Sequence, residues 1–545
     1  MAVFLKNKIF PILLVFLSAS LFLVAFYKAK SQLFIGFSDA AKFADIARNQ
    51  IEGYGYVTDY ITFAPELIKQ GLPVFVWWIP PMMPLAIAAT FKFFGVSDPS
   101  IIATSSFFLL GLIVATYFLG KKLFGQLAGI LAAIAVAFNI HFLEYATSGA
   151  SEPLFALEII LGAYLFILKK KGADILGFVT LIAMYFTRPQ AFIYIAGLIL
   201  LWLLLRFPTK KAFLYFLGVI FIGLLVDRFI LTLLNGKFFL YPILGRASYV
   251  LGYTPGSSSS ELLRGIAQEA TVLAIFKKAF YNLYNFYKLL PEWISPYIWS
   301  AFVIGIFKWG KDRIENSFKM TTIFMVVVTL LVTALSIPLF RYLHPVVPLV
   351  YLFGVSTLVW IVEQISNFQS PISSQFRIFN FKITKRLFII LSSSSLVLVF
   401  VVGQTLGAIF LDSRYKAKTV NRDKPPVYVT LSMILKENTK PEDVVVTNID
   451  TWGSWYGERR TVWYPLKPDQ ILGLEDKIDV IYLTSYLMDD ENYFMGKEWR
   501  QIFENPKSPG DEFIAKYYKF AGEFNVSSDE TFSNESARAV LLIRR

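Results

Sequence analysis

Eleven apolar stretches occupy most of the chain, and basic residues separate them in a regular alternation. A helix crosses a bilayer with about 20 apolar residues, and the stretches that we interpret as spans are 9–27, 100–119, 123–139, 150–168, 173–187, 190–205, 212–233, 293–308, 318–337, 343–361 and 387–410. Lysine and arginine gather in the loops on one side, which the positive-inside rule assigns to the cytoplasm. These residues are Lys6, Lys8, Lys121-Lys122, Lys169-Lys170-Lys171, Arg206, Lys210-Lys211, Lys308, Lys311, Arg313, Lys382 and Lys385-Arg386. Lys28 and Lys30, beside the first stretch on the other side, depart from this pattern.

Residues 80–95 form a further apolar segment that this alternation excludes as a span. The segment begins Pro80-Pro81-Met82-Met83-Pro84, contains Lys92 and is shorter than a spanning helix. Counting it as a span would place every later lysine cluster outside. We therefore expect a helix on the outer membrane surface, within a long first external loop of residues 28–99.

Composition places the chain among integral membrane proteins. It has 545 residues, of which 56% are hydrophobic and 17% aromatic, more apolar surface than one soluble core can bury. The net charge of +13 lies mostly in short cytoplasmic loops, where orientation and anionic lipids explain it without nucleic acid. The chain has no cysteine, which excludes disulfides and thiolate chemistry.

The character of the sequence changes after Leu411, where charged residues become frequent and no further span occurs. Residues 442–447, 478–484 and 539–543 have the pattern of short buried strands, and 427–437 that of a helix. The expected fold is an α-helical polytopic membrane protein with about 11 transmembrane helices over residues 1–410, followed by an extracytoplasmic α/β domain over 411–545. Residues 235–290, with Ser257-Ser258-Ser259-Ser260, form a second external segment, and 362–384 a cytoplasmic linker.

The first notable polar residue is Asp39, which opens an amphipathic helix just after the first span. Ala40, Phe43, Ala47 and Ile51 share one stripe of this helix, and the opposite face is formed by Lys42, Asp45, Arg48, Asn49 and Glu52. Because aspartate is a favoured N-cap residue, capping alone could account for Asp39.

Further polar residues fall on the same external face. They are His141 and Glu144 after the third span, Glu152 at the start of the fourth, Arg188 at the end of the fifth, and Arg341, Tyr342 and His344 at the start of the tenth. Each has an ordinary explanation, since boundary acids can be solvated, Glu152-Pro153 is a common helix start, and a single arginine can reach lipid headgroups. Two arginines, three acids and both histidines of the chain on one face favour a shared site.

This set of side chains suits transfer of a group from an anionic lipid. Arginine makes paired, charge-assisted hydrogen bonds to phosphate oxygens, and a carboxylate can take the proton of an attacking hydroxyl. The sequence has no phosphate-cradling glycine loop and no Asp-x-Asp pair for a metal-bound nucleotide sugar. An activated lipid-phosphate donor would supply the energy where nucleotides are absent.

Several short motifs, in order, resemble one family. They are Ser38-Asp39-Ala40-Ala41-Lys42-Phe43-Ala44-Asp45-Ile46-Ala47-Arg48-Asn49, Pro80-Pro81-Met82-Met83-Pro84, Gly120-Lys121-Lys122-Leu123-Phe124-Gly125, Thr147-Ser148-Gly149-Ala150-Ser151-Glu152-Pro153, Thr187-Arg188-Pro189, Arg341-Tyr342-Leu343-His344-Pro345 and Tyr456-Gly457-Glu458-Arg459-Arg460. In that order they resemble the GT-C membrane glycosyltransferases related to dolichyl-phosphate-mannose protein mannosyltransferases and the lipid A aminoarabinose transferase, in particular prokaryotic members.

The resemblance implies a polyprenyl-phosphate-sugar donor, inverting transfer of a hexosyl or pentosyl group outside the membrane, and an acid of the first external loop as the catalytic residue. Asp39 matches that acid, Glu152 the second acidic position, and Arg341 a basic position near the lipid phosphate. Ala40 and Gln190 stand where many members have Glu, so the paired acid of a metal site is missing and we predict no cofactor.

The predicted site therefore comprises Asp39 and Glu152 as catalytic residues, with Arg188, Arg341, Tyr342, His344, Glu144 and His141 binding substrate. The resemblance implies a lipid, glycan or protein hydroxyl as the acceptor, as in protein glycosylation or cell-envelope assembly, and we expect the protein in the plasma membrane of a prokaryote with a cytoplasmic N-terminus. Membrane lipids are further expected partners.

Two alternatives differ in mechanism. A transporter or flippase for a lipid-linked glycan would use ionisable residues within the bilayer, for which Glu158 and Asp227-Arg228 are candidates, but the sequence shows no internal repeat. An oligosaccharyltransferase-like enzyme would carry a Trp-rich external motif, to which Trp452-Gly453-Ser454-Trp455-Tyr456-Gly457 is loosely similar.

Overall fold

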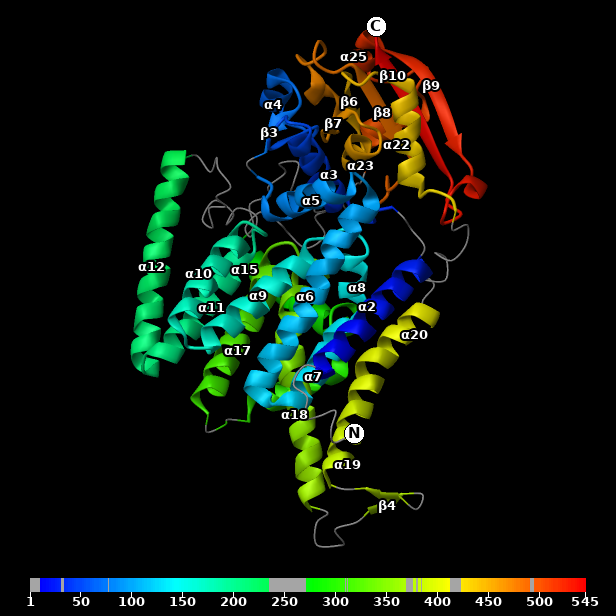
Figure 1. Ribbon diagram of the computed structural model, residues 1–545. Coiled ribbons are helices and arrows are strands. Elements are labelled where there is room, and N and C mark those ends of the chain that lie inside the picture. The colour runs from blue at the N-terminus through cyan, green and yellow to red at the C-terminus, as the bar shows by residue number, and fades with distance from the viewer. Residues whose placement is uncertain are drawn as a thin grey trace.

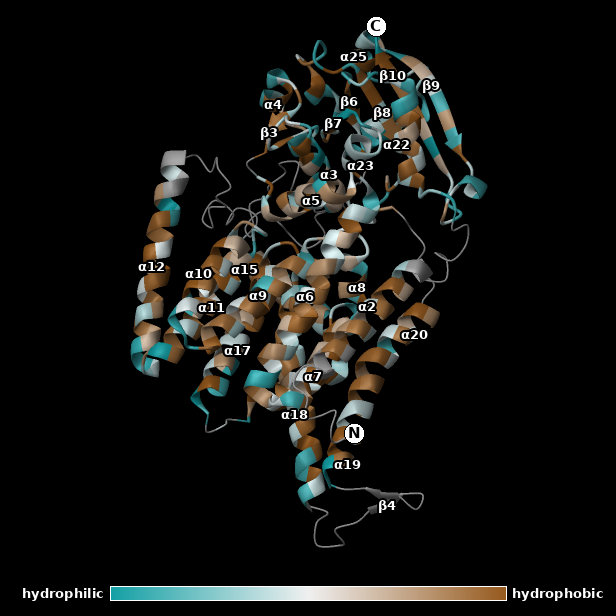
Figure 2. Ribbon diagram, viewed as in Figure 1, coloured by the Kyte–Doolittle hydropathy of each residue, from teal (hydrophilic) through white to brown (hydrophobic). Residues whose placement is uncertain are grey.

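The structure is a computed structural model that describes residues 10–30, 34–76, 78–234, 271–308, 310, 312–368, 376–378, 381–383, 385–411, 423–490 and 495–545. A thick layer of apolar helices lies below a smaller unit that contains a β-sheet, and two helices of the first loop, α3 (Ser38–Ile51) and α5 (Met82–Phe94), lie between them (Figures 1 and 2). The tetraserine 257–260 and most of segment 235–290 lie outside the described residues.

A helix occurs within each of the eleven predicted spans. The helical layer contains α2 (Phe10–Lys30), α6 (Asp98–Phe124), α7 (Gln126–Ala137), α8 (Ile140–Ala146), α9 (Glu152–Ile167), α10 (Lys171–Tyr185), α11 (Ala191–Arg206), α12 (Thr209–Leu234), α15 (Val272–Lys288), η2 (Leu290–Glu292), α16 (Pro296–Ile306), α17 (Arg313–Leu335), η3 (Phe340–Tyr342), η4 (His344–Val346), α18 (Val347–Phe368), α19 (Lys385–Val397), the π-helical η5 (Leu398–Gly403) and α20 (Gln404–Leu411). Among the described residues, five helices are long and apolar enough to cross a membrane, or six if α7 and α8 form one span bent by 59°. The chain is therefore a multi-pass membrane protein.

Small residues let the helices of this layer approach closely. A Cβ on Gly120 of α6 would lie 2.8 Å from the Cα of Gly129 on α7, so only glycine fits there. The break between α7 and α8 falls at Asn139, whose side chain accepts hydrogen bonds from the backbone N–H groups of His141 and Phe142. This cap turns the chain and directs α8 along the boundary between the two layers.

A six-stranded sheet forms the core of the upper unit, with the order β2-β7-β6-β8-β10-β9. The four strands from β2 to β8 run parallel, and β10 is antiparallel to both β8 and β9. The bounds are β2 (Tyr60–Thr62), β6 (Val444–Thr447), β7 (Arg460–Trp463), β8 (Val480–Thr484), β9 (Tyr518–Val526) and β10 (Ala537–Arg544). The strands predicted within 442–447, 478–484 and 539–543 are thus present as β6, β8 and β10. Every residue of β6 and β8 is buried, as parallel strands covered on both faces require.

Short helices complete this unit, which we call the sheet domain (residues 423–545). They are α22 (Val427–Asn438), α23 (Asp450–Trp455), η7 (Pro468–Ile471), α24 (Lys497–Glu504), α25 (Glu512–Tyr517) and η8 (Ser528–Glu530). The edge strand β2 comes from the first loop, more than 350 residues earlier in the chain, and pairs with β7 through Tyr60 opposite Thr461. No local pattern in the sequence predicts this strand. A boundary at residue 411 stays a prediction.

The rest of the first loop packs against one side and the lower face of the sheet domain (Figure 1). This part of the loop contains α3, β1 (Val57–Thr58), α4 (Pro65–Gln70), β3 (Val74–Phe75) and α5. Elsewhere, in the predicted linker 362–384, the strands β4 (Phe376–Ile378) and β5 (Phe381–Ile383) pair in antiparallel orientation. The 13 residues of α5 extend only about 20 Å, too little to cross a hydrocarbon core of about 30 Å.

The polar face of the amphipathic helix α3 is largely covered by protein. Asp45 is completely buried and Asn49 is 3% exposed. Ala40 and Ala47 on the apolar stripe are buried too, so both faces of the helix contact protein. The reason is that two segments cover this face: residues 57–59 of the first loop, which hydrogen-bond to Asp45 and Asn49, and α23 of the sheet domain. Its carbonyl groups at Ser454 and Trp455 accept hydrogen bonds from Arg48 at 3.0 and 3.2 Å.

The orientation in the membrane can be tested in a chain that has no native cysteine. Lys92→Cys on α5 and Glu437→Cys on α22, both exposed, should react with an impermeant maleimide from outside the cell. Lys170→Cys, in the lysine cluster after α9, should react only after the membrane is permeabilised. Reaction of Lys170→Cys from outside the intact cell, with Lys92→Cys protected until the membrane is permeabilised, would make residues 80–95 a span.

Candidate active site

Asp39 lies in the first turn of α3, but it is not the cap of that helix. The N-cap residue is Phe37, and no side chain forms a cap hydrogen bond there. The Asp39 carboxylate instead accepts a hydrogen bond from Nη2 of Arg341 at 2.6 Å and lies 3.3 Å from Nζ of Lys42. Burial opposes ionisation of Asp39, but the charges of Arg341 and Lys42 outweigh it and hold the pKa of this carboxyl well below its usual range.

Arg341 connects Asp39 to a second acid, Glu152. Its Nη2 lies 2.9 Å from Oε1 of Glu152, and its Nε donates to the same oxygen at 3.1 Å. On the other side, Nη1 of Arg188 contacts Oε1 of Glu152 at 2.7 Å and donates to Oγ of Ser151 at 3.1 Å. Acids and arginines therefore alternate in one chain of ion pairs, Asp39–Arg341–Glu152–Arg188, which we call the charge chain.

The two ends of the charge chain differ in exposure. The side chains of Asp39 and Arg341 are 31% and 25% exposed, whereas those of Glu152 and Arg188 are 1% and 8% exposed. Glu152 and Arg188 thus form a buried base, and an incoming molecule can reach the Asp39–Arg341 end. Oε2 of Glu152 is buried with no hydrogen-bond partner among the described residues.

Four separate segments carry the charge chain. Glu152 begins α9 with proline at the next position, a favoured start because proline has no N–H group to lose. Arg188 lies in the short link between α10 and α11, and Arg341 lies in the 3₁₀ turn η3, where the chain leaves α17 and enters α18. Gly149 lets α3 approach the start of α9: its φ is +79°, and a Cβ there would lie 3.0 Å from the Cβ of Ala40.

Both histidines lie next to each other at the same boundary. The rings of His141 on α8 and His344 in η4 have centroids 4.4 Å apart, and the Tyr145 hydroxyl lies 2.7 Å from Nδ1 of His344. Nδ1 of His141 lies 3.8 Å from Oε2 of Glu144. Tyr342 follows Arg341 in η3 and is half-buried.

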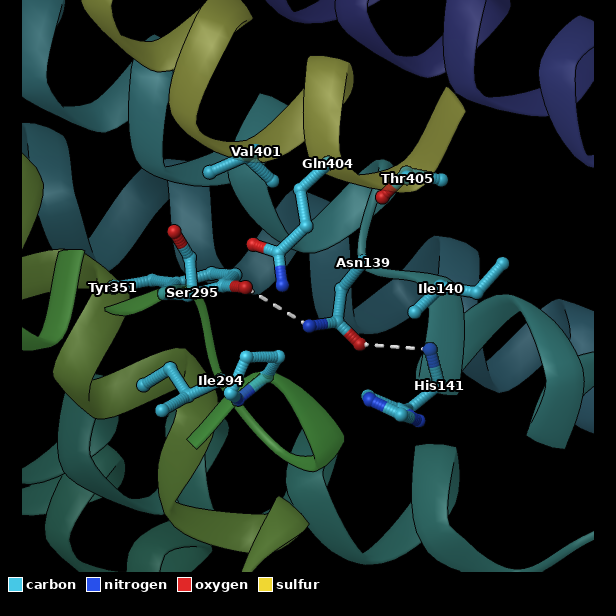
Figure 3. A pocket seen from close by; sticks show the side chains of 10 residues that line it. Asn139, Ile140, His141, Ile294, Ser295, Tyr351, Val401, Gln404 and Thr405 are labelled. Atoms are coloured by element: carbon cyan, nitrogen blue, oxygen red, sulfur yellow. Dashed lines mark hydrogen bonds between the residues drawn. The ribbon is translucent and has the colours of Figure 1, made fainter. Parts of the chain in front are cut away.

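A small polar pocket lies on the other side of His141. Figure 3 shows its imidazole ring directed toward the side chains of Asn139, Ser295 and Gln404, beneath the π-helical segment η5 and α20. Nδ2 of Asn139 donates to the Tyr351 hydroxyl at 2.9 Å. None of the four members of the charge chain lines this pocket, and His141 is the predicted site residue that does.

The structure thus brings Asp39, Glu152, Arg188 and Arg341 into direct contact and forms a second group from His141, Glu144 and His344. Sequence reasoning missed Tyr145 and Ser151, which hydrogen-bond to predicted residues. Both lie within four residues of Glu144 or Glu152 in the chain, which is the only signal that could have pointed to them. Among the described residues, no group of three or more His, Asp or Glu side chains could hold a metal ion.

Comparison with known proteins identifies the fold. Residues 79–227 match the model of the family described as dolichyl-phosphate-mannose-protein mannosyltransferase. The crystal structure of ArnT from Cupriavidus metallidurans bound to undecaprenyl phosphate superimposes with a TM-score of 0.52 and 13% identity, covering 97% of each chain. The chain has the GT-C fold. The archaeal oligosaccharyltransferase AglB from Archaeoglobus fulgidus, in complex with an inhibitory peptide and a dolichol-phosphate, also matches with a TM-score of 0.52 and 12% identity, covering 95% of this chain and 73% of AglB.

No curated protein sequence matches the chain. Glu152 and Arg188 lie inside the region that matches the family model, whereas Asp39 and Arg341 lie outside it. The grouping of Asp39 and Arg341 with Glu152 and Arg188 therefore rests on the geometry of the site. Arg341 pairs with both Asp39 and Glu152 and so joins the two parts.

Asp45 and Asp39 should differ sharply in their effect on stability. Oδ1 of Asp45 accepts from Arg48 at 2.9 Å, and Oδ2 accepts from the Thr58 hydroxyl at 2.7 Å and the Asp59 backbone N–H at 2.9 Å. An asparagine has only one oxygen that accepts hydrogen bonds, so it could accept from Arg48 or from Thr58 and Asp59, but not from both sides. Asp45→Asn should therefore lower the free energy of unfolding by about 1–3 kcal/mol. Thermal unfolding in detergent should show a lower Tm for Asp45→Asn.

Asp39→Asn should change the Tm little, because its carboxylate is partly solvated and such ion pairs contribute little to stability. Glu52→Gln, an exposed substitution at the end of the same helix, is the matched control. Equal Tm values for Asp45→Asn and Glu52→Gln would contradict the buried contacts of Asp45.

Proposed function

We propose that the chain transfers a sugar from a polyprenyl-phosphate donor to a hydroxyl group of a lipid, glycan or protein at the external membrane face, with inversion. The observation that carries this proposal is the ion-paired charge chain, with two guanidinium groups beside a partly exposed carboxylate. Two proteins of similar fold support the proposal, because the ArnT structure contains undecaprenyl phosphate and the AglB structure contains a dolichol-phosphate. The orientation proposed from the lysine clusters puts this site outside the plasma membrane of a prokaryote.

The reaction uses the two exposed members of the charge chain differently. The acceptor oxygen attacks C1 of the sugar, Asp39 takes the hydroxyl proton, and the bond between C1 and the phosphate oxygen breaks. The bonding electrons stay with the lipid phosphate, which gains negative charge as it leaves. Arg341 and Arg188 are suited to stabilise that charge, because it is larger in the transition state than in the bound donor.

Arg341 has to change partners during this reaction. Without donor it is bound to Asp39 and Glu152, and a carboxylate paired in this way is a weak base. A lipid phosphate that binds Arg341 would compete with Asp39 for the guanidinium group and add negative charge nearby. Both effects raise the pKa of Asp39 and make it a stronger base, so donor binding would activate the base that the acceptor needs.

The structure gives less support to the two alternatives. Glu158, one candidate for a transport path, is buried and accepts a hydrogen bond from the Thr187 hydroxyl at 2.8 Å, which links it to the segment that carries Arg188. Trp452 and Trp455, the tryptophans of the motif similar to oligosaccharyltransferases, are 4% and 7% exposed. Trp452 stacks on Tyr428 inside the sheet domain and Trp455 stacks on Phe91 of α5, so both are poorly placed to bind an acceptor peptide.

Replacement of the base tests the proposed reaction. Asp39→Asn keeps the size of the side chain but cannot take a proton, and should lower the transfer rate by about 10²–10⁴-fold. The assay follows release of undecaprenyl phosphate from a panel of undecaprenyl-phosphate hexoses and pentoses by protein in liposomes that contain envelope extract. Glu52→Gln should transfer at the parental rate. If Asp39→Asn keeps that rate, Asp39 is not the base.

The pH dependence tests the partner exchange of Arg341. The acid limb of kcat/KM for the donor reports Asp39 in the free enzyme, where its pKa is lowered, and the acid limb of kcat reports the donor complex. Activity falls as pH drops through the pKa of the base. The acid limb of kcat should therefore lie at higher pH than that of kcat/KM. Coincident limbs would contradict release of Asp39 by the donor.

A further inference from the structure

The four residues before α3 form an extended segment that is held by side chains from distant parts of the chain. Ile35 is completely buried, and its backbone N–H donates to Oδ2 of Asp98 at 3.1 Å and to the Tyr456 hydroxyl at 3.2 Å. Its backbone carbonyl accepts from the Tyr428 hydroxyl at 2.7 Å. Both polar groups of this one peptide residue are thus bound to residues from α6 and the sheet domain.

Asp98 is the centre of these contacts. Besides Ile35, it accepts from Nε1 of Trp455 at 2.9 Å and from the Tyr456 hydroxyl at 2.5 Å. Asp98 lies in the first turn of α6, where the helix dipole favours an acid, but the N-cap residue of that helix is Ser97. Its carboxylate therefore holds three segments together: the start of α6, the segment before α3, and α23 of the sheet domain.

The far end of α3 is held by the same helix of the sheet domain. Arg48 donates to the carbonyl groups of Ser454 and Trp455, and its guanidinium lies 5.3 Å from the Trp455 ring centroid. With Ile35 bound before the helix and Arg48 bound near its end, α3 can neither rotate nor slide without breaking contacts to α23. Rotation of α3 would move Asp39 away from Arg341.

We propose that Asp98, Tyr456 and Tyr428 are positioning residues for Asp39, so that the sheet domain sets the geometry of the transfer site without touching substrate. The inference rests on the proposed function. Only three residues lie between Ile35 and Asp39, so a displacement at Ile35 passes directly to the carboxylate. A misplacement of about 1 Å can lower a reaction rate by about 100-fold.

The decisive variant is Tyr456→Phe, which removes one hydroxyl and leaves the aromatic packing in place. Its matched control is Tyr482→Phe in β8, which also removes a buried hydroxyl of the sheet domain, one that donates to the Leu431 carbonyl at 3.0 Å. Tyr456→Phe should lower kcat by about 10- to 100-fold with little change in KM for the donor. Tyr482→Phe should leave kcat unchanged. Asp98→Asn, which puts an amide N–H group among donors, should behave like Tyr456→Phe.

A double-mutant cycle separates positioning from a general loss of structure. In the Asp39→Asn background the base is already absent, so Tyr456→Phe should lower the residual rate no further. Equal fold losses in the presence and absence of Asp39, or equal effects of Tyr456→Phe and Tyr482→Phe, would overturn the inference. If Tyr456→Phe is poorly folded, Tyr428→Phe and Asp98→Asn take its place in the same cycle. An inactive parental protein would instead count against the proposed transfer reaction.

Discussion

The guanidinium group of Arg341 holds the site together, because it binds the partly exposed Asp39 and the buried Glu152 at the same time. The carboxylates of Asp39 and Glu152 both contact Nη2 of Arg341, and they would repel each other without this cation between them. Arg188 adds a second positive charge on the buried side of Glu152. The arrangement keeps Asp39 ionised and leaves Arg341 partly exposed, and in the proposed mechanism Arg341 receives the lipid phosphate while Arg188 adds positive charge from the buried side.

This interaction depends on parts of the chain that are far apart. Arg341 and Asp39 are 302 positions apart, and the segment before Asp39 is bound by Tyr428 and Tyr456, about 400 positions away. The sheet domain therefore packs on the first loop through hydrogen bonds from side chains to backbone as well as through β2, which joins its sheet. In the proposed mechanism these contacts fix a base that the membrane helices alone would leave free to move.

The sequence predicted the features that follow from local pattern. Hydropathy and charge located a helix in each of the eleven predicted spans but not α8 or α15, the length argument identified α5 as too short to span, and short apolar runs identified β6, β8 and β10. It could not predict β2, because the three residues Tyr60, Ile61 and Thr62 are a strand only when β7 lies beside them. The burial of Asp45 could not be predicted for a related reason. An amphipathic pattern does not reveal whether water or another part of the protein covers the polar face of a helix.

The site was predicted in the same partial way. The external-face residues Asp39, Glu152, Arg188 and Arg341 could be grouped by topology and by resemblance to a family, but no sequence pattern reveals which acid pairs with which arginine. The pairing matters, because it turns Asp39 from a solvated carboxylate into one that shares Arg341. Tyr145, Ser151 and Asp98 were missed because each occupies an ordinary helical or capping position in the sequence, and its partner is visible only in the fold.

The affinity of the protein for undecaprenyl phosphate tests most directly whether Asp39 and a lipid phosphate compete for Arg341. If they compete, Asp39→Asn frees the guanidinium group and should bind undecaprenyl phosphate roughly two- to fivefold more tightly than the parental protein. The measurement is a thermal-shift titration in detergent, with Glu52→Gln as the control. Weaker or unchanged binding by Asp39→Asn would contradict the account, because it would mean that the lipid phosphate does not take the place of Asp39 on Arg341.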